Sequence, residues 1–344
     1  MLMKKILIIQ TAYIGDVILA TPLIENLKKH FNDVSLDFLL RKGNESLLKN
    51  HPVINEVLIW DKKKDKNKGL WNLAKIIRKR KYDAVINLQR FLSSGLMVAF
   101  SGAKKVIGFD KNPMSFMFSD KLPHLIGEKT QTGFVHETQR NLSLLSPLGI
   151  KNIEDHRPRL YPSLSDREKV AIYKEASYIC LAPTSVWYTK QFHKEGWINF
   201  IKNLDFDGKI YLLGASSDFD ACESIINEAG KSNVENLTGK LNLLQSAALM
   251  EGALVNFVND SAPMHLASSV NAPVCAIYCS TVPDFGFGPL SEFSEVVEVK
   301  EKLDCRPCGL HGYKACPQKH FSCAKDIQTT QLLEVFEKAK AYQN

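Results

Sequence analysis

Asp16 is the first residue whose type and position suggest chemistry. It follows the apolar run KILIIQ (5–10) and a short loop, at the expected start of a helix. The helix dipole favours the ionised form of a carboxyl group at this place, and an ionised carboxylate is suited to take a proton from a hydroxyl group. Asp16 is equally a good N-cap residue. The local pattern therefore leaves two interpretations open, a general base and a helix cap.

The stretch NDSAPMHLASS (259–269) has the residue types of a phosphate-binding helix start. Small side chains and a proline in the expected first turn leave backbone N–H groups accessible at the positive end of the helix dipole. His265 lies in the same turn, within reach of the same ligand. A structural interpretation stands beside this one: Asp260 and Ser261 cap the helix, and His265 packs in the core.

The stretch APTSVWYTKQFHKEGW (182–197) is a second candidate for phosphate contact. We expect a strand, a polar loop that carries Lys190, and a helix that begins near residue 194. A lysine beyond the carboxyl end of a strand in an open sheet can neutralise a phosphate in the cleft. The simpler alternative is an exposed lysine, and the aromatic residues of this stretch suit either a pocket or packing.

Four of the eight cysteines are spaced C-x₂-C-x₇-C-x₆-C, and they are Cys305, Cys308, Cys316 and Cys323. This spacing allows a structural zinc ion bound by four thiolates. The second pair is wider than a standard zinc knuckle, so reduced structural cysteines are the favoured alternative. The other four cysteines sit singly in apolar segments, as small core residues do in a reducing compartment.

Apolar runs of strand length alternate with helical patterns along the whole chain, which predicts an α/β protein with parallel sheets. We expect strands at 5–10, 34–40, 54–60, 82–88, 104–109, 178–184, 209–215, 254–260 and 273–279. Helices are expected over 16–30, 69–80, 92–101, 219–229, 243–252, from 263, and 329–342. The polar segment 150–169 with its two prolines is the best boundary. Two Rossmann-like domains facing a cleft are therefore predicted, residues 1–160 and 161–344.

Composition and charge narrow the class of protein. Apolar content of 45% and charged content of 24% are those of a globular protein, and neither half contains GxGxxG or GxxxxGK[ST], which disfavours a simple dehydrogenase or a P-loop enzyme. Residues 1–165 hold 27 Lys and Arg against 15 Asp and Glu, whereas residues 166–344 hold 17 against 22. The basic first half suggests an acidic partner. The start MLMKKILIIQ lacks a signal-peptide cleavage site, so we expect a cytoplasmic protein.

These stretches together resemble the heptosyltransferases, glycosyltransferase family 9, which are inverting enzymes with the GT-B fold. KILIIQTAYIGDVILATPLIENLKKHF is similar to the family's first strand, GD turn and helix. TSVWYTKQFHKEGW resembles its donor-binding lysine loop, and VNDSAPMHLASS resembles its D-[ST]-G-x-x-H-L-A signature. CRPCGLHGYKACPQKHFSCAKDI is similar to the cysteine segment of the heptosyltransferase II branch. One departure is Ala262, where the family has glycine.

The resemblance implies a role for each matching residue. Asp16 would be the general base on the acceptor hydroxyl, and Lys190 would hold the donor diphosphate. The further donor-binding positions implied are Asp260, Ser261, Ala262, Pro263 and His265, with Thr184, Ser185, Ser216 and Leu241 on the nucleotide side. Candidate acceptor contacts are Arg78, Arg80, His136 and Arg140.

The resemblance also implies a reaction and its partners. The donor would be ADP-heptose, the acceptor the anionic inner core of lipopolysaccharide, and the step one displacement with inversion. Fixed hydrogen-bond donors can replace a metal at the leaving group, so no cofactor is expected. The enzyme would contact the cytoplasmic face of the inner membrane peripherally, and we expect no nucleic-acid partner.

Three alternatives remain at the level of the sequence. The same fold could use another sugar nucleotide or acceptor, or belong to an isomerase-type relative. A basic nucleic-acid-binding protein with a four-cysteine zinc module is the third, although its basic residues lack interleaved aromatic residues.

Overall fold

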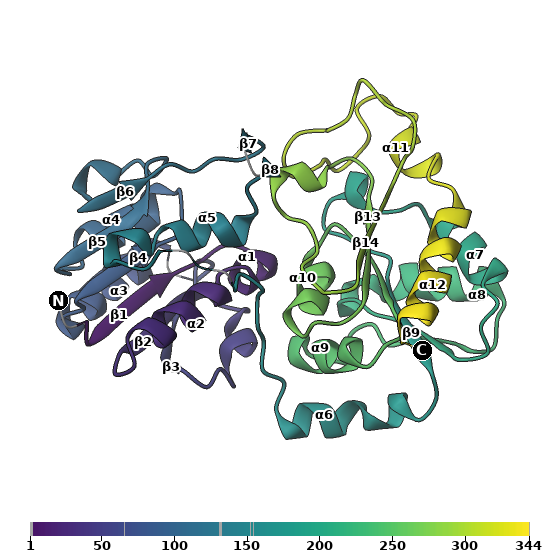
Figure 1. Ribbon diagram of the computed structural model, residues 1–344, viewed down its shortest axis with the longest axis horizontal. Coiled ribbons are helices and arrows are strands. Elements are labelled where there is room, and N and C mark those ends of the chain that lie inside the picture. The colour runs from purple at the N-terminus through teal and green to yellow at the C-terminus, as the bar shows by residue number, and fades with distance from the viewer. Residues whose placement is uncertain (1–2, 65, 131–132, 152, 154, 344) are drawn as a thin grey trace. The chain divides into compact units, whose positions relative to one another are not determined.

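The computed structural model describes residues 3–64, 66–130, 133–151, 153 and 155–343. The chain divides into two compact units, Met1–Tyr161 and Pro162–Asn344, and each unit holds one large sheet (Figure 1). The sequence placed this division between residues 160 and 161. In the described part of the chain, no helix is both long and apolar enough to cross a membrane.

Six parallel strands form the sheet of the first unit, in the order β3-β2-β1-β4-β5-β6. They are β1 (Lys5–Ile9), β2 (Ser35–Arg41), β3 (Ile54–Trp60), β4 (Ala84–Asn87), β5 (Lys105–Phe109) and β6 (Asp120–Leu122). The chain winds outward from β1 on one side and from β4 on the other. The crevice beyond the carboxyl ends of β1 and β4 is therefore the switch point, where ligands bind in open α/β sheets.

Helices cover both faces of this sheet. They are α1 (Ile14–Ile18), α2 (Thr21–His30), α3 (Lys66–Arg80), α4 (Leu92–Ala99) and α5 (Glu137–Ser143). The pair α3 and α4 packs on one face, where Leu73 and Ile77 meet Met97 and Val98 over the strands. The pair α2 and α5 lies on the opposite face (Figure 1). A two-stranded ribbon, β7 (Lys129–Thr130) with β8 (Gly133–Phe134), precedes α5.

The second unit repeats this plan with the strand order β11-β10-β9-β12-β13-β14. Its strands are β9 (Tyr178–Ala182), β10 (Lys209–Leu212), β11 (Val234–Asn236), β12 (Asn256–Asn259), β13 (Val274–Tyr278) and β14 (Ser294–Glu298). Its switch point lies beyond β9 and β12, so both predicted phosphate-binding stretches begin at one crevice. All these strands pair in parallel, which confirms the predicted α/β class with parallel sheets.

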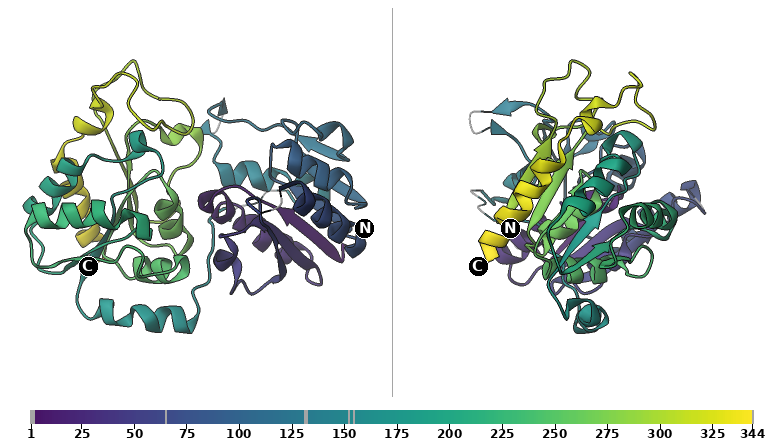
Figure 2. Two further views of the ribbon diagram at one scale, coloured as in Figure 1. Left: turned by 180° about the vertical axis from the view of Figure 1, so that it is seen from behind. Right: turned by 90° about the vertical axis from the view of Figure 1, so that its right-hand side faces the viewer.

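The helices of the second unit are α6 (Leu164–Val170), α7 (Lys194–Asn203), α8 (Phe219–Ala229), α9 (Leu243–Glu251), α10 (Ala262–Ser269), α11 (Ser322–Lys325) and α12 (Thr329–Gln343). Trp197, Ile225 and Phe336 bring α7, α8 and α12 into one core over the sheet, and the lengthwise course of α12 along that sheet is visible in Figure 2. Helices α6, α9 and α10 pack together elsewhere in the unit.

The structure differs from the sequence prediction at the helix expected over 16–30. This helix is broken, because α1 ends at Ile18 and α2 begins at Thr21. Pro22 has no N–H group to donate to the Ile18 carbonyl, and its ring would crowd that carbonyl in a continuous helix, so α1 ends at Ile18 and Pro22 lies in the first turn of α2. The edge strands β6, β11 and β14 and the helices α5 and α6 were not predicted. They are short, and their burial patterns are only partly apolar.

Gly95 offers a test of how tightly α4 packs beside the first switch point. A Cβ atom at Gly95 would lie 2.2 Å from Asn112 Oδ1 and 2.8 Å from Met114 Cβ. We expect Gly95→Ala to lower the free energy of unfolding by about 1–3 kcal/mol because the loop must move. Gly69→Ala in α3 is the control, since its nearest neighbour is 3.5 Å away and alanine favours helix by about 0.5–1 kcal/mol. Urea unfolding measures both, and equal effects would contradict the packing argument.

Candidate active site

The loop that carries Asp16 is built by the ends of four strands. It follows β1, and side chains that follow β2, β3 and β4 bind it. The contacts are Asn44 Nδ2 to the Ala12 carbonyl at 3.1 Å, Lys62 Nζ to the Thr11 carbonyl at 2.7 Å, and Gln89 Nε2 to Gln10 Oε1. Because parallel strands end at one edge, these residues meet although they are far apart in sequence.

Asp16 lies at the third position of α1 and is half-buried. Its Oδ2 atom accepts a hydrogen bond from the Tyr13 backbone N–H at 3.1 Å, so the side chain closes the first turn. The capping interpretation is thus part of the geometry. The same position holds the carboxylate at the positive end of α1 and at the first switch point, as a general base requires.

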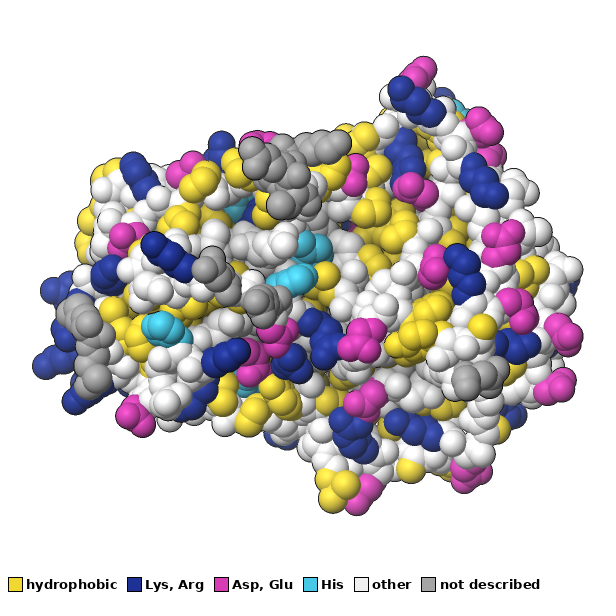
Figure 3. All heavy atoms as spheres, in the orientation of Figure 1, with side chains coloured by type: hydrophobic (Ala, Val, Ile, Leu, Met, Phe, Trp, Pro, Cys, Tyr) yellow, Lys and Arg dark blue, Asp and Glu magenta, His cyan; other side chains and the backbone are white. Residues whose placement is uncertain are grey.

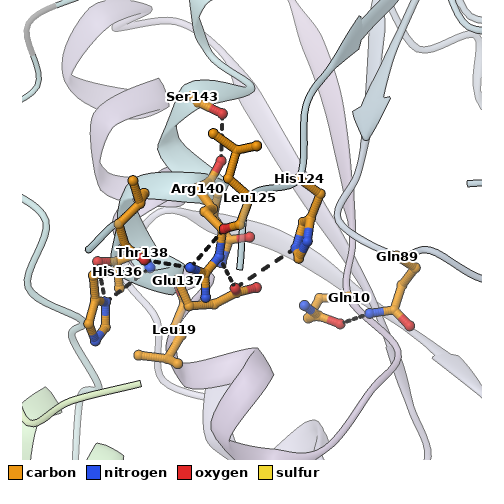
Figure 4. Close-up of polar contacts among 12 residues, drawn as sticks. Gln10, Leu19, Gln89, His124, Leu125, His136, Glu137, Thr138, Arg140 and Ser143 are labelled. Atoms are coloured by element: carbon orange, nitrogen blue, oxygen red, sulfur yellow. Dashed lines mark hydrogen bonds and ion pairs between the residues drawn. The ribbon is translucent and has the colours of Figure 1, made fainter. Parts of the chain in front are cut away.

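A buried polar cluster joins α5 to the β6–β7 connection (Figure 4), and the charge of Asp16 acts on its Glu137 carboxyl group. Arg140 Nε donates to Glu137 Oε2 at 2.7 Å, and its Nη1 atom donates to the carbonyls of Leu125 and Val135. His124 Nε2 lies 3.9 Å from the same carboxylate oxygen. Asn141 Nδ2 reaches the Leu19 carbonyl at 3.1 Å, so α5 is fastened to the end of α1.

Burial sets the protonation states of this cluster. It raises the pKa of Glu137, and the nearby charge of Asp16 raises it further, whereas Arg140 and Arg90 act in the opposite direction. Burial, together with Arg90 and Arg140, lowers the pKa of His124 to about 4. His124 is therefore uncharged at neutral pH, and Arg140 is the cation that stabilises Glu137.

Of the predicted acceptor contacts, His136 and Arg140 lie on the Asp16 side of the sheet. His136 is the N-cap of α5, where its Nδ1 atom accepts from the Thr138 N–H at 3.2 Å. Arg140 is buried, and its described contacts support the α5 and loop backbone rather than an open surface.

The other two predicted acceptor contacts, Arg78 and Arg80, lie elsewhere in the first unit. Helix α3 starts after the carboxyl end of β3 and returns to the amino end of β4, so its last turn reaches the amino edge of the sheet. Arg80 binds Glu56 there at 2.6 and 2.7 Å and Asp37 at 3.2 Å. Ligands of parallel sheets bind at the opposite edge, so this placement gives no support to acceptor contacts by Arg78 and Arg80.

In the second unit the structure joins the two stretches that the sequence singled out. Lys190 ends a short 3₁₀ turn after β9, and Asp260 follows β12. Lys190 Nζ lies 2.6 Å from Asp260 Oδ2, and Thr281 Oγ1 donates to the same oxygen at 2.6 Å. Both charged side chains are largely buried, and each supplies the counter-charge of the other. Thr281, which follows β13, is a site residue that the sequence analysis missed.

Helix α10 begins directly after this ion pair. Ser261 is the extended N-cap residue, but its side chain makes no capping bond, and Ala262 and Pro263 form the first turn. Ala262 has helical backbone, so the methyl group in place of the family glycine causes no left-handed strain. The first N–H groups of a helix lack partners within the helix, and a single proline removes only one of them. This end of α10 can therefore receive an anion.

His265 packs beneath the ion pair and is only 5% exposed. Within the described part of the chain no group hydrogen-bonds to its buried Nδ1 atom. Burial, with a smaller effect from the charge of Lys190, lowers the pKa of His265 to about 3. The ring is therefore neutral at physiological pH and can act there as a hydrogen-bonding group, not as a cation.

The remaining predicted donor positions lie on loops at the same edge. Thr184 and Ser185 follow β9, whereas Ser216 and Leu241 follow β10 and β11. Gly239 brings the last two loops together, because its N–H donates to the Gly214 carbonyl at 3.0 Å. Its φ of 73° and a distance of 2.9 Å from its would-be Cβ to Ser216 Cα both require glycine.

The cysteine segment supports the Lys190 turn. Tyr313 N–H donates to Thr189 Oγ1 at 2.8 Å, and Thr189 N–H donates to the Tyr313 carbonyl at 3.1 Å. Ser280 Oγ donates to Thr189 Oγ1 at 3.0 Å, and Cys308 N–H donates to the Ser280 carbonyl at 2.7 Å. Thr189 is thereby fixed on both sides, and with it the backbone of Lys190.

All eight cysteines are free thiols. Cys305 Sγ lies 3.8 Å from His320 Nε2, and burial raises the pKa of Cys308 and Cys323. Among the described residues, which include Cys305, Cys308, Cys316 and Cys323, no three or more Cys, His, Asp or Glu side chains are arranged to hold a metal ion.

Glu137, whose carboxyl group feels the charge of Asp16, and His124, which lies beside Glu137, are further polar residues that the sequence analysis did not single out as chemical groups. The sequence offered one indication of a role for Glu137, because this residue lies in the HETQR segment next to His136, a predicted acceptor contact. His124 had none, since it lies in a connection without regular secondary structure.

The buried His265 leads to a pH-dependent stability. Unfolded histidine titrates near pH 6.5 and folded His265 near pH 3, so between these values the unfolded state binds more protons and acid favours unfolding. From pH 6.5 to pH 5 this amounts to about 2 kcal/mol. The unaltered protein should therefore lose this free energy of unfolding when the pH falls from 6.5 to 5. We expect His265→Asn to lose about 2 kcal/mol less over the same pH interval, as measured by urea unfolding at both pH values. His30→Asn, at an exposed position, is the control. If His265→Asn kept the same dependence of unfolding free energy on pH as the unaltered protein, the neutral state of folded His265 would be refuted.

Comparison with known proteins agrees with this architecture. The model of the family described as Glycosyltransferase family 9 (heptosyltransferase) matches residues 70–312. Lipopolysaccharide heptosyltransferase 3 of Escherichia coli is 29% identical over 279 residues, covering 78% of this chain and 81% of the relative. Lipopolysaccharide heptosyltransferase 2 of Escherichia coli strain K12 is 23% identical over 320 residues, covering 86% and 88%.

Solved structures show the same fold. A glycosyl transferase family 9 protein from Veillonella parvula superposes with a TM-score of 0.84 at 20% identity, covering 98% of this chain and 97% of that one. The ADP-heptose lipopolysaccharide heptosyltransferase II of Escherichia coli gives a TM-score of 0.79 at 21% identity, covering 98% and 99%. With a family model that matches well over half of its length, the chain belongs to glycosyltransferase family 9, the heptosyltransferases.

Proposed function

We propose that this enzyme transfers a heptose from ADP-heptose to the inner core of lipopolysaccharide, with inversion and without a metal ion. The observation that carries the proposal is the Lys190–Asp260 ion pair at the start of α10, at the switch point of the second sheet. A cation and a helix N-terminus at one crevice are suited to a diphosphate. The family supplies the reaction class, and the names of the lipopolysaccharide heptosyltransferases that resemble the chain suggest the acceptor.

The second unit would bind the donor and stabilise the leaving group. Lys190 and the N–H groups of Ser261 and Ala262 would meet the charge that develops on the diphosphate as its bond to the anomeric carbon breaks. Asp260 would hold the Lys190 side chain in place, as the 2.6 Å contact between them supports. The neutral His265 would donate or accept one hydrogen bond. Thr184, Ser185, Ser216 and Leu241 would line the nucleotide side.

Asp16 would act on the acceptor. The acceptor hydroxyl oxygen attacks the anomeric carbon as the carbon–oxygen bond to ADP breaks, and the hydroxyl proton passes to the Asp16 carboxylate. One displacement inverts the configuration at that carbon. The buried Glu137–Arg140 pair would support this base through α5 and its bond to the Leu19 carbonyl.

The basic first unit would favour an anionic acceptor, with His136 at the capped end of α5 as a candidate contact. The enzyme would work at the cytoplasmic face of the inner membrane, in peripheral contact with it. Ala262 departs from the family pattern, which keeps another sugar nucleotide as the second candidate donor.

A transfer assay tests the proposal. Purified enzyme is incubated with a heptose-deficient core lipid and either ADP-heptose, ADP-glucose or UDP-glucose, in the presence of EDTA. Mass spectrometry detects the added sugar and NMR its anomeric configuration. Inverted heptose transfer that survives EDTA is expected. Transfer only from another nucleotide would establish the second candidate, whereas retention or a metal requirement would contradict the mechanism.

Asp16→Asn should remove the base and leave donor binding intact. We expect kcat to fall by about 10²–10⁴, the usual contribution of general-base catalysis, while the Kd for ADP measured by calorimetry changes less than twofold. The exposed Asp33 lies in the same unit, so Asp33→Asn serves as the control with normal turnover. Near-normal kcat in Asp16→Asn would rule out its assignment as the base.

Lys190→Gln should act on the donor instead. Loss of the cation at the diphosphate should lower kcat/KM by about 10²-fold and weaken ADP binding. Lys190→Arg should recover part of both, because the charge remains. Lys194→Gln is the matched control, since this lysine binds Ser224 and Glu228 away from Asp260. Unchanged ADP affinity in Lys190→Gln would show that the diphosphate binds elsewhere.

A further inference from the structure

Helix α4 presents an apolar surface that the proposed chemistry does not use. Residues 91–103 contain no charged side chain, although the helix lies on the outside of the sheet (Figure 1). Phe91, Leu92 and Phe100 are exposed at its two ends, and Leu96 between them is partly exposed. Large apolar side chains gathered on one exposed face commonly mark an interaction site.

Two neighbouring segments enlarge this surface. Trp71 of α3 is 47% exposed, and its ring centroid lies 5.6 Å from that of Phe100. The β5–β6 connection adds Phe116, 74% exposed, and Met117. This connection is fixed to the start of α4, because Asn112 Nδ2 donates to the Gln89 and Phe91 carbonyls at 2.8 and 3.1 Å. We call these side chains, with the exposed lysines and arginine of α3, the α3–α4 surface.

The border of the α3–α4 surface is basic. Helix α3 (Lys66–Arg80) contains six Lys and Arg and no Asp or Glu. Lys68, Lys75 and Arg78 share the helical stripe of Trp71, and all three are exposed. Arg78 Cγ would lie 3.5 Å from a Cβ at Gly102, so the stripe adjoins the end of α4. In the described part of the chain, no acidic side chain forms an ion pair with Lys68, Lys75 or Arg78.

The charge continues from α3 to the amino edge of the sheet. Arg78, Lys79, Arg80 and Lys81 are consecutive, and Figure 3 shows Lys and Arg side chains gathered at the left-hand edge of the first unit. The surface thus combines exposed aromatic rings with a row of cations along α3. This combination is typical of segments that rest in the interface of an anionic bilayer.

We infer that the α3–α4 surface docks the enzyme on an anionic lipid bilayer. Trp71, Phe100, Leu92 and Phe116 enter the boundary between headgroups and acyl chains, and Lys68, Lys75 and Arg78 contact anionic headgroups. A second copy of the chain is disfavoured as the occupant, because two such surfaces face to face would bring their cations together. The inference rests on the membrane contact of the proposed function and adds the surface that makes this contact and brings the enzyme to a lipid-anchored acceptor.

Vesicle binding tests the inference without turnover. The full chain is sedimented with phosphatidylcholine vesicles and with vesicles in which about a third of the lipid is phosphatidylglycerol. We expect binding to the anionic vesicles alone, weakened by salt. Brominated lipid should quench the fluorescence of Trp71, and Trp71→Phe should lose this quenching, because Trp60 and Trp197 are buried and the partly exposed Trp187 belongs to the second unit.

Paired variants separate the two contributions. Lys68→Gln with Lys75→Gln should weaken binding about 30-fold, since each lysine near an anionic surface contributes about 1 kcal/mol. Trp71→Ala with Phe100→Ala should weaken it about tenfold or more. The controls are Lys202→Gln with Lys209→Gln, and Leu164→Ala with Ile172→Ala, which are exposed residues of the second unit.

Three results would overturn the inference: no binding to anionic vesicles, equal losses in the control variants, or self-association of the chain that Trp71→Ala with Phe100→Ala abolishes. Failure of the proposed function is distinguishable from each of them. It would appear as absent heptose transfer to a water-soluble core fragment by the unaltered enzyme, whereas both surface variants should keep transfer to that fragment within twofold.

Discussion

A parallel sheet must carry its chain back to the same starting edge after every strand, so each unit carries the loops that follow its strands at one edge. In both units the order of the strands reverses between the first and the fourth, and the helices on the two sides leave a crevice at that point. Asp16 and the Gln89 contact lie at this place in the first unit, and Lys190 and Asp260 lie at the corresponding place in the second. The positions of all four depend on the parallel winding.

Buried charge is stabilised differently at the two crevices. In the second unit Lys190 and Asp260 neutralise one another directly, and the Thr281 hydroxyl donates a hydrogen bond to the Asp260 carboxylate. In the first unit Asp16 has a backbone partner, and the buried cation Arg140 is directed to Glu137 behind it. An unpaired charge in either place would cost several kcal/mol. The arrangement therefore provides a fixed cation where the donor phosphate is proposed to bind and a carboxylate where the base is proposed to act.

The cysteine segment shows how a long irregular loop can serve a site without contributing a chemical group to it. Between β14 and α11 the chain has no helix or strand, yet Tyr313 and Cys308 hold Thr189 and Ser280 through backbone hydrogen bonds. Loops of this length are uncommon unless they have a function. Here the function visible in the contacts is to fix the turn that ends in Lys190.

The sequence by itself determined the α/β class, most strands, and the three stretches that carry Asp16, Lys190 and His265. It could do so because buried parallel strands are continuous apolar runs and because helix starts have local residue signals. It missed the break in the first long helix, although Pro22 was visible, and it missed the edge strands β6, β11 and β14, which are short or only partly buried. Only the tertiary structure decided that Lys190 binds Asp260, that Arg80 lies at the edge opposite Asp16, and that Trp71 meets Phe100. Each of these contacts depends on where the chain returns across a sheet. Packing between segments that are distant in sequence decides this, so the local sequence does not predict it.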